Sequence, residues 1–455
     1  MCAALSFAVA SEQNDTHDVA ARIVGAALVD SRAHDKLAWL TDRIGNRLAG
    51  SEALTRAIAW SAEQFERDGL ERVWTDEVMV PHWVRGRERA RVVAPVEHRL
   101  PILALGGSVG TPEGGITAEV VVVDGFESLE VLGEAARGRI VLFNRKMERG
   151  FTSENGYGSL SKFRSAGPSA AAKQGAVAML IRSLGTADYR LPHTGALRYE
   201  DGVEKIPSAA VTAEDAMLIA RLAEAGETVR IELELGSKTL PDARSANVLA
   251  ELRGRERPDE VVVIGAHLDS WDVGTGAHDD GAGCAIVMET MRLLKKHDLI
   301  PRRTIRAVLF TNEENGLRGG RDYAERYADE MPRHVAAIES DLGGGAPIGF
   351  GVTAGEGGVE IVREIAKHLS VIGADQVFPR GGGADISRMK EYGVPQIAQL
   401  PDPALYFDYH HTEADTLDKI DRHDLDRNVA AMALMAYMLA EWDEPLPRIE
   451  VVDDD

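Results

Sequence analysis

Residues 260–267 have the sequence Glu-Val-Val-Val-Ile-Gly-Ala-His, an apolar run that ends in two small residues and a histidine. Such a run is typical of a strand that is buried on both faces, as in the parallel sheets of α/β proteins. His267 stands where the strand ends, and in open α/β sheets ligands bind at the carboxyl ends of the strands. The stretch therefore predicts an α/β fold with a polar site at one edge of its sheet.

Two more predicted strands are followed by acidic side chains. The apolar run at 304–311 precedes Glu313 and Glu314, and the run at 335–339 precedes Asp341. Because the carboxyl ends of parallel strands meet at one edge of a sheet, we expect these carboxylates to lie near the histidine of the first strand.

Two further motifs contribute polar side chains. A glycine-rich turn at 274–283 carries Asp279 into a predicted helix at 284–296, and its small residues allow the backbone to approach an ion closely. Near the carboxyl end of the chain, residues 410–416 have the sequence His-His-Thr-Glu-Ala-Asp-Thr and include His411.

Together these motifs supply imidazole nitrogens and carboxylate oxygens, a mixture that suits Zn²⁺ better than a thiolate-preferring metal or an all-oxygen calcium site. The candidate ligands are His267, Asp279, Glu314, Asp341 and His411. One shared carboxylate and two further ligands per metal would use all of them, which favours two zinc ions. Alone, each motif is commonly structural, as an Asp-Asp-Gly turn is. Their order at successive strand ends indicates a hydrolytic metal site.

Two acidic residues beside the candidate ligands have expected roles. Neighbouring side chains point in different directions, so Glu314 can bind metal while Glu313 faces a zinc-bound water. There Glu313 can take the proton of the water and return it to the leaving amine. Asp269 can accept the second ring N–H of His267 and so fix the tautomer of this histidine.

The same motifs resemble those of the di-zinc aminopeptidase-type metallopeptidases, and within them the carboxypeptidase Q subfamily. The strings that carry the resemblance are 267–274, 279–281, 313–314, 339–341 and 410–416. Further similar stretches lie outside the metal-site motifs, at 81–86, 114–120, 192–195 and 201–203, so the resemblance covers roughly residues 30–445.

The resemblance implies a role for each site residue. Asp279 would bridge two zinc ions, His267 and Asp341 would complete one metal, and Glu314 and His411 the other. Glu313 would be the general base, and the peptide bond between Asp279 and Asp280 would be cis.

Three more histidines require separate interpretation. In related aminopeptidases a tyrosine often precedes the last ligand and helps to stabilise the oxyanion. Here that position holds His410, a candidate catalytic residue whose role the resemblance leaves open. We expect His278 to be structural, and also His193, unless the middle of the chain folds over the site.

The resemblance also divides the chain. We expect residues 17–115 to begin the peptidase domain, 116–238 to form an inserted protease-associated domain, and 239–446 to form the catalytic domain, a mixed sheet flanked by helices on both faces. The inserted segment carries no ligand-like cluster, so we expect it to shape access to the site or to form a subunit interface in a homodimer.

Composition restricts the partners. The 73 acidic and 51 basic residues give a formal net charge of −22, which argues against nucleic acids and anionic membranes. No apolar run approaches the length of a membrane span. Residues 1–16 are typical of a truncated secretory leader with cleavage before Ser11, which predicts a periplasmic or secreted protein; otherwise the protein would be cytoplasmic.

We therefore expect a zinc exopeptidase that hydrolyses short peptides with free N-termini, dipeptides above all, through a metal-bound hydroxide. A free α-amine can approach the acidic site as a cation, whereas a blocked amine would have to lose its amide hydration. The alternatives are a glutamate-releasing carboxypeptidase or an N-acyl amino acid hydrolase on the same scaffold, and a non-catalytic binding protein with a protease-associated domain.

Overall fold

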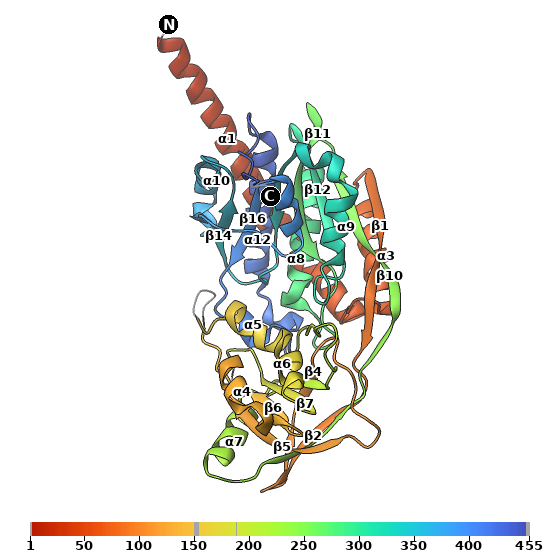
Figure 1. Ribbon diagram of the computed structural model, residues 1–455. Helices are drawn as coiled ribbons and strands as arrows, with labels where there is room; N and C mark the ends of the chain where they lie inside the picture. Colours follow the sequence, from red (N-terminus) through yellow and green to blue (C-terminus); the bar gives the residue numbers. More distant parts are fainter. Residues whose placement is uncertain (1, 150–153, 188, 452–455) are drawn as a thin grey trace.

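The computed structural model describes residues 2–149, 154–187 and 189–451, and its side chains are described from Thr16 onward. Within these residues the strands form two eight-stranded sheets, each in a body of its own (Figure 1). We call them the large body, in the upper half of the figure, and the inserted body, in the lower half.

The sheet of the large body is mixed. Its order is β1 (Arg72–Val84), β10 (Lys238–Leu252), β12 (Arg303–Phe310), β11 (Arg257–His267), β13 (His334–Glu339), β16 (Gln396–Pro401), β14 (Pro347–Thr353) and β15 (Gln376–Phe378). The four strands from β12 to β16 run parallel, while β1 and β10 at one edge and β14 near the other pair antiparallel. Val262 and Ile264 of β11 pack into the core on one face, and Val261 and Val263 pack into the core on the other. The expected α/β fold is confirmed, and β11, the strand predicted from residues 260–267, is buried on both faces.

Helices cover both faces of this sheet because each buries an apolar stripe against it. One face carries α1 (Cys2–Asp30), α2 (Ala33–Trp39), η1 (Leu40–Ile44), α3 (Glu52–Arg67), α8 (Ala282–Lys296), α10 (Gly358–Ala366), η5 (Lys367–Ile372) and α12 (Arg422–Glu441). The other face carries α9 (Arg318–Arg326), η4 (Ala328–Arg333) and η6 (Ile386–Tyr392).

The chain is not helical between the end of η1 at Ile44 and the start of α3 at Glu52. Gly45 and Gly50 both have a φ of 84°, a left-handed conformation that favours glycine. Ser51 then caps α3, because its side-chain oxygen accepts a hydrogen bond from the amide of Leu54 at 3.1 Å.

The inserted body has its own sheet and helices. The strand order is β3 (His98–Leu100), β2 (Glu88–Ala94), β9 (Arg230–Leu235), β5 (Ile116–Val123), β6 (Ile140–Phe143), β7 (Ala178–Arg182), β8 (Ser208–Val211) and β4 (Ile102–Ala104). The helices are α4 (Phe126–Leu132), η2 (Gly133–Ala136), α5 (Tyr157–Ser165), α6 (Gly167–Lys173) and α7 (Ala213–Glu224).

The inserted sheet includes strands that precede residue 116, where we expected the middle domain to begin. Strand β2 pairs with β9, and β4 pairs with β8, so residues 88–104 belong to this sheet by hydrogen bonding. The chain enters the inserted body from β1 and leaves it into β10, and these two strands pair as far as Val84 and Lys238 (Figure 1).

The expected leader falls on α1, whose N-terminal end projects from the large body (Figure 1). Residue 1 and the side chains up to residue 15 lie outside the described part of the chain, so cleavage before Ser11 stays a prediction. Among the described helices, none combines the length and apolar character that a membrane span requires.

Candidate metal centre

The candidate ligands gather at the carboxyl edge of the parallel strands. β11 ends at His267. Its neighbour β12 ends directly opposite, at Phe310, and β13 ends at Glu339, which pairs with Gly265 two residues before His267. The loops after these two strands carry Glu314 and Asp341. The turn η3 (Ala277–Gly281) carries Asp279, and His411 follows the short helix α11 (Tyr406–Tyr409).

The five side chains form two groups that share Asp279. In the first, His267 Nε2 lies 3.1 Å from Asp279 Oδ1 and 3.3 Å from Asp341 Oδ1. In the second, His411 Nε2 lies 3.0 Å from both Asp279 Oδ2 and Glu314 Oε2. Each oxygen of Asp279 therefore faces one group, which is the arrangement that a bridging carboxylate requires.

Backbone carbonyls orient both imidazoles. His267 Nδ1 lies 3.0 Å from the carbonyl oxygen of Asp269, and His411 Nδ1 lies 3.3 Å from that of Thr194. If each Nδ1 donates its proton there, each Nε2 keeps a lone pair for a metal.

The carboxylate of Asp269 differs from our expectation. It lies 3.8 Å from His267 Nδ1, too far for a hydrogen bond. It accepts instead from the amides of Glu313 and Glu314, at 3.1 and 3.3 Å. The backbone carbonyl of Asp269, and not its carboxylate, lies within hydrogen-bond distance of His267 Nδ1. The carboxylate instead positions the turn after β12.

A second carboxylate that the sequence analysis did not single out holds the Asp279 turn. Asp415 Oδ1 accepts from the amides of Ala277 and His278 at 3.1 and 2.7 Å, and its Oδ2 accepts from that of Asp279 at 3.1 Å. Burial raises the pKa of Asp415 to about 7. The peptide bond between Asp279 and Asp280 is cis, as expected. Asp415 lies in the 410–416 motif, and this position was the feature of the sequence that could have indicated its role.

The remaining carboxylates are perturbed by burial. Burial, reinforced by Asp341 and Glu314, raises the pKa of Glu313 well above its ordinary value, although His267 opposes the shift. Burial also raises the pKa of Glu314 to about 7, and its Oε1 accepts from the Trp271 amide at 3.1 Å. Crowded buried carboxylates resist ionisation unless positive charge lies between them, so this set favours a bound cation.

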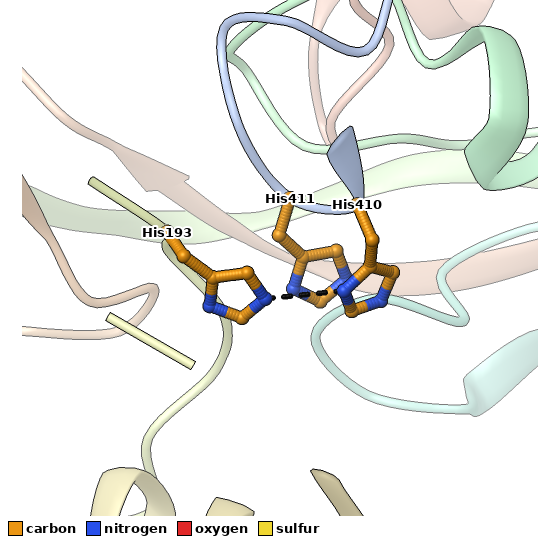
Figure 2. Close-up of side chains that lie close together, drawn as sticks. All are labelled: His193, His410 and His411. Atoms are coloured by element: carbon orange, nitrogen blue, oxygen red, sulfur yellow. Dashed lines mark hydrogen bonds between the residues drawn. The ribbon is translucent and has the colours of Figure 1, made fainter. Parts of the chain in front are cut away.

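His193 and His410 stand beside the second group (Figure 2). His410 Nε2 lies 3.2 Å from Asp279 Oδ2, and His193 Nε2 lies 3.1 Å from His410 Nδ1. His193 comes from the inserted body, so the middle of the chain does fold over the site. His278, in contrast, accepts a hydrogen bond from the Gly344 amide through Nδ1 and stacks on Tyr409, which is a structural role.

Comparison with known proteins identifies the family. Carboxypeptidase Q of Homo sapiens is 40% identical over 434 residues, which cover 95% of this chain and 90% of that protein. Carboxypeptidase Q of Mus musculus is also 40% identical over 434 residues, with 95% and 91% covered. The pattern described as Peptidase family M28 matches residues 247–436. The chain belongs to peptidase family M28.

Solved structures agree with this assignment. The crystal structure of a Peptidase M28 precursor from Shewanella amazonensis SB2B matches with a TM-score of 0.93 and 38% identity, covering 96% of this chain and 99% of that one. BSAP, a zinc aminopeptidase from Bacillus subtilis, shares the fold with a TM-score of 0.69 at 20% identity, covering 93% of this chain and 99% of that one. The M28 chain is therefore a metallopeptidase related to carboxypeptidase Q, as its motifs indicated.

One further residue of this M28 peptidase supports the site from a distance. Arg47 is fully buried, and its guanidinium donates to the carbonyls of Leu268, Gly45, Thr275 and Gly276 at 2.7 to 3.0 Å. It therefore ties together the loop that joins His267 to Asp279. No motif in the sequence indicated this role for Arg47.

Proposed function

We propose that this M28 peptidase is a two-zinc exopeptidase that removes N-terminal residues from short peptides, dipeptides above all. The observation that carries the proposal is the pair of three-ligand groups that share Asp279.

The donors fit zinc. Each group offers one imidazole nitrogen and two carboxylate oxygens, and such mixed sets are common at catalytic zinc sites. Asp279 Oδ2 is buried and lacks a hydrogen-bond partner of proper geometry, although two imidazole nitrogens lie within 3.2 Å of it. Atoms that converge in this way without a hydrogen bond are suited to a shared cation. Zinc would supply Lewis-acid chemistry, because it lowers the pKa of a water and polarises a carbonyl oxygen.

The protein's own groups would move the protons. We assign Glu313 as the general base, which takes a proton from the attacking water and returns it to the leaving amine. We assign His410 as the donor that stabilises charge developing on the substrate carbonyl oxygen, since its Nε2 faces the same space as the ligands.

The preference for a free N-terminus follows from the negative charge of the carboxylates at the site. Buried carboxylates surround the centre, and the ion pairs of Asp279, Glu314 and Asp341 are with histidines. A free α-ammonium group would add the positive charge that such a site attracts, whereas an acylated amine would not.

The inserted body supports a preference for short substrates. Trp271, beside the ligands, packs into one core of this body, and Phe407 packs into another. Thr186 and Arg149 of the inserted body also bind the Asp408 carboxylate, at 2.5 and 2.9 Å. We propose that this body is a protease-associated domain that limits the length of peptide beyond the scissile bond.

A carboxypeptidase that takes acidic C-terminal residues is the second candidate, because one pocket favours it. A cavity of about 750 Å³ is lined mostly by the inserted body and also by Glu413 of the large body. One of its lining residues, Pro192, precedes His193, and Glu413 lies two residues after His411. Its arginines are Arg87, Arg89, Arg91, Arg99 and Arg190. Arg89 and Arg91 are already paired with Glu232, and Arg190 with Asp215, which leaves the first candidate favoured.

A panel of matched dipeptides separates the candidates. Each dipeptide would be offered free, N-acetylated and C-amidated to the zinc-loaded protein, with a Glu or Leu residue at the C-terminus. We expect hydrolysis of the free and amidated forms and at least about a tenfold lower kcat/KM after acetylation, which removes the charged amine. Preference for the acetylated form, or for C-terminal Glu with loss on amidation, would support the carboxypeptidase alternative. Zinc-loaded protein that cleaves none of the panel would contradict both.

Location and assembly are separate proposals. Export is supported by the leader-like residues 1–16, and the intact mass of protein secreted by its own host would test it. A homodimer is supported by exposed apolar side chains along β1 and β10, namely Met79, Val84 and Leu240. Sedimentation would show whether the protein is a dimer.

A further inference from the structure

The inserted body contacts the two adjacent histidines of the metal centre at two places. The Tyr157 ring of α5 packs edge-on against the His410 ring, with 5.0 Å between the centroids, and a short segment, His193 and Thr194, makes polar contacts with both histidines. The amide of Thr194 donates to the carbonyl of His411 at 3.0 Å, and the carbonyl of Thr194 lies 3.3 Å from His411 Nδ1. His193 lies 3.1 Å from His410 through their ring nitrogens (Figure 2). One segment thus reaches both a proposed metal ligand and its neighbour.

This segment is held firmly by the inserted body. The amide of His193 donates to the Ser183 hydroxyl at 2.9 Å, and Ser183 in turn donates to the carbonyl of Val211 at the end of β8. The Thr194 hydroxyl donates to the carbonyl of Ala104 at the end of β4. His193 itself is only 1% exposed. The imidazole therefore has a fixed place relative to the inserted sheet.

The contact between the two rings has two possible proton arrangements. In one, His193 Nε2–H donates to His410 Nδ1, so His410 carries its own proton on Nε2. In the other, His410 Nδ1–H donates to His193 Nε2.

The surroundings favour the first arrangement. Nδ1 of His193 is buried without a partner, so a proton placed there would be an unsatisfied donor. The second arrangement would also turn the lone pair of His410 Nε2 toward Asp279 Oδ2, which lies 3.2 Å away. Two lone pairs at that distance repel each other, whereas an N–H group so close to a carboxylate oxygen is attracted to it electrostatically, even without hydrogen-bond geometry.

We infer that His193 is a positioning residue that holds His410 in its Nε2–H tautomer, with the N–H directed into the metal centre. The inference rests on the proposed function, in which His410 Nε2–H is the donor to the substrate carbonyl. The peptidase site is then complete only when the inserted body lies against it, because among the described side chains the polar partner of His410 Nδ1 is His193.

The test compares two replacements of His193 in the full-length, zinc-loaded protein. His193→Gln keeps an N–H donor near the position of Nε2, whereas His193→Leu removes it. With a dipeptide substrate, we expect His193→Leu to lower kcat roughly 10- to 100-fold, the usual cost of losing a residue that orients a metal-site group. KM should change by no more than about twofold, and His193→Gln should restore kcat to within about threefold of wild type.

Three controls separate positioning from other effects. Thr186→Val removes a contact of 2.5 Å between the inserted body and Asp408 but leaves the histidines untouched, and it should keep wild-type kcat. In a His410→Gln background, His193→Leu should cause no further loss, because the two residues act through one contact. Zinc content should be equal in wild type and in His193→Leu.

A readout without activity completes the test. In protein labelled with ¹⁵N-histidine, the ring nitrogen shifts of His410, assigned with His410→Gln, should report the Nε2–H form in wild type and a tautomer mixture in His193→Leu. Loss of peptidase activity from every protein would contradict the proposed function, and these shifts would still decide the role of His193.

Several results would overturn the inference. These are wild-type kcat in His193→Leu, equal losses in His193→Leu and His193→Gln, or an equal loss in Thr186→Val. An extra zinc ion that disappears in His193→Leu would also overturn it, because His410 Nδ1 would then bind metal together with His193.

Discussion

Replacement of Arg47 by methionine is expected to destabilise the protein strongly and to loosen the metal centre. Methionine has a side chain of similar length but cannot donate a hydrogen bond. The change would leave the carbonyls of Leu268, Gly45, Thr275 and Gly276 without their buried partner. Three of these carbonyls belong to the loop between His267 and Asp279.

The size of the effect follows from those contacts. A hydrogen bond to a charged group contributes about 1.5–3 kcal/mol, and Arg47 makes four by the distances above. Removing the guanidinium also removes the cost of burying its charge, so the contributions do not simply add. We expect a net loss of roughly 3–5 kcal/mol, because each buried carbonyl left without its donor costs about 1–3 kcal/mol and the relief of burying the charge offsets part of the sum.

Arg43 offers a matched control because it lies four residues before Arg47, in η1, and is exposed to solvent. Arg43→Met should change the free energy of unfolding by no more than about 0.5 kcal/mol. Urea unfolding followed by circular dichroism would compare the two variants, and competition with a chelator would compare their zinc affinity. Zinc affinity of Arg47→Met should fall about tenfold or more. Equal urea midpoints for Arg47→Met and Arg43→Met would refute the reasoning.

Three further predictions use other residues. Glu313→Gln should keep zinc and fold but lower kcat by roughly 10²–10⁴, since it removes only proton transfer; more than about a tenth of wild-type turnover would exclude Glu313 as the base. Asp415→Ala should weaken zinc binding about 10- to 100-fold, because three backbone amides of the Asp279 turn lose their acceptor; unchanged affinity in a chelator titration would count against this role. Burial lowers the pKa of His334 to about 4. In the unfolded chain this histidine therefore takes up a proton at a higher pH than it does in the folded protein. The free energy of unfolding decreases as pH falls from 6.5 to 4. The decrease in stability from pH 7 to pH 4 should be smaller in His334→Asn by on the order of 3 kcal/mol, and equal decreases in the two proteins would contradict the assignment.

Much of the candidate site could be predicted from the sequence because its parts are local. An apolar run followed at once by a polar residue predicts a strand end, and parallel strands bring their carboxyl ends to one edge. His267, Glu314 and Asp341 were placed together for that reason, and the structure brings them into two groups around Asp279. The resemblance to the di-zinc aminopeptidase-type metallopeptidases rested mainly on the same short strings, and the comparisons confirmed a metallopeptidase.

Other features depend on contacts between segments far apart in the chain, which no local pattern encodes. His193 and His410 are separated by 217 positions, and only the docking of the inserted body brings their rings together. Arg47 is similarly remote from the 268–276 loop that it supports. Residues 88–104 join the inserted sheet because β9 and β8 complete their hydrogen bonds, and those partners follow them by more than 100 positions. The sequence by itself determined which side chains are candidate metal ligands and which carboxylate is the candidate base, through strand periodicity and motif order. The tertiary structure decided which groups orient them, because a buried donor is matched to its acceptor only after the chain has folded.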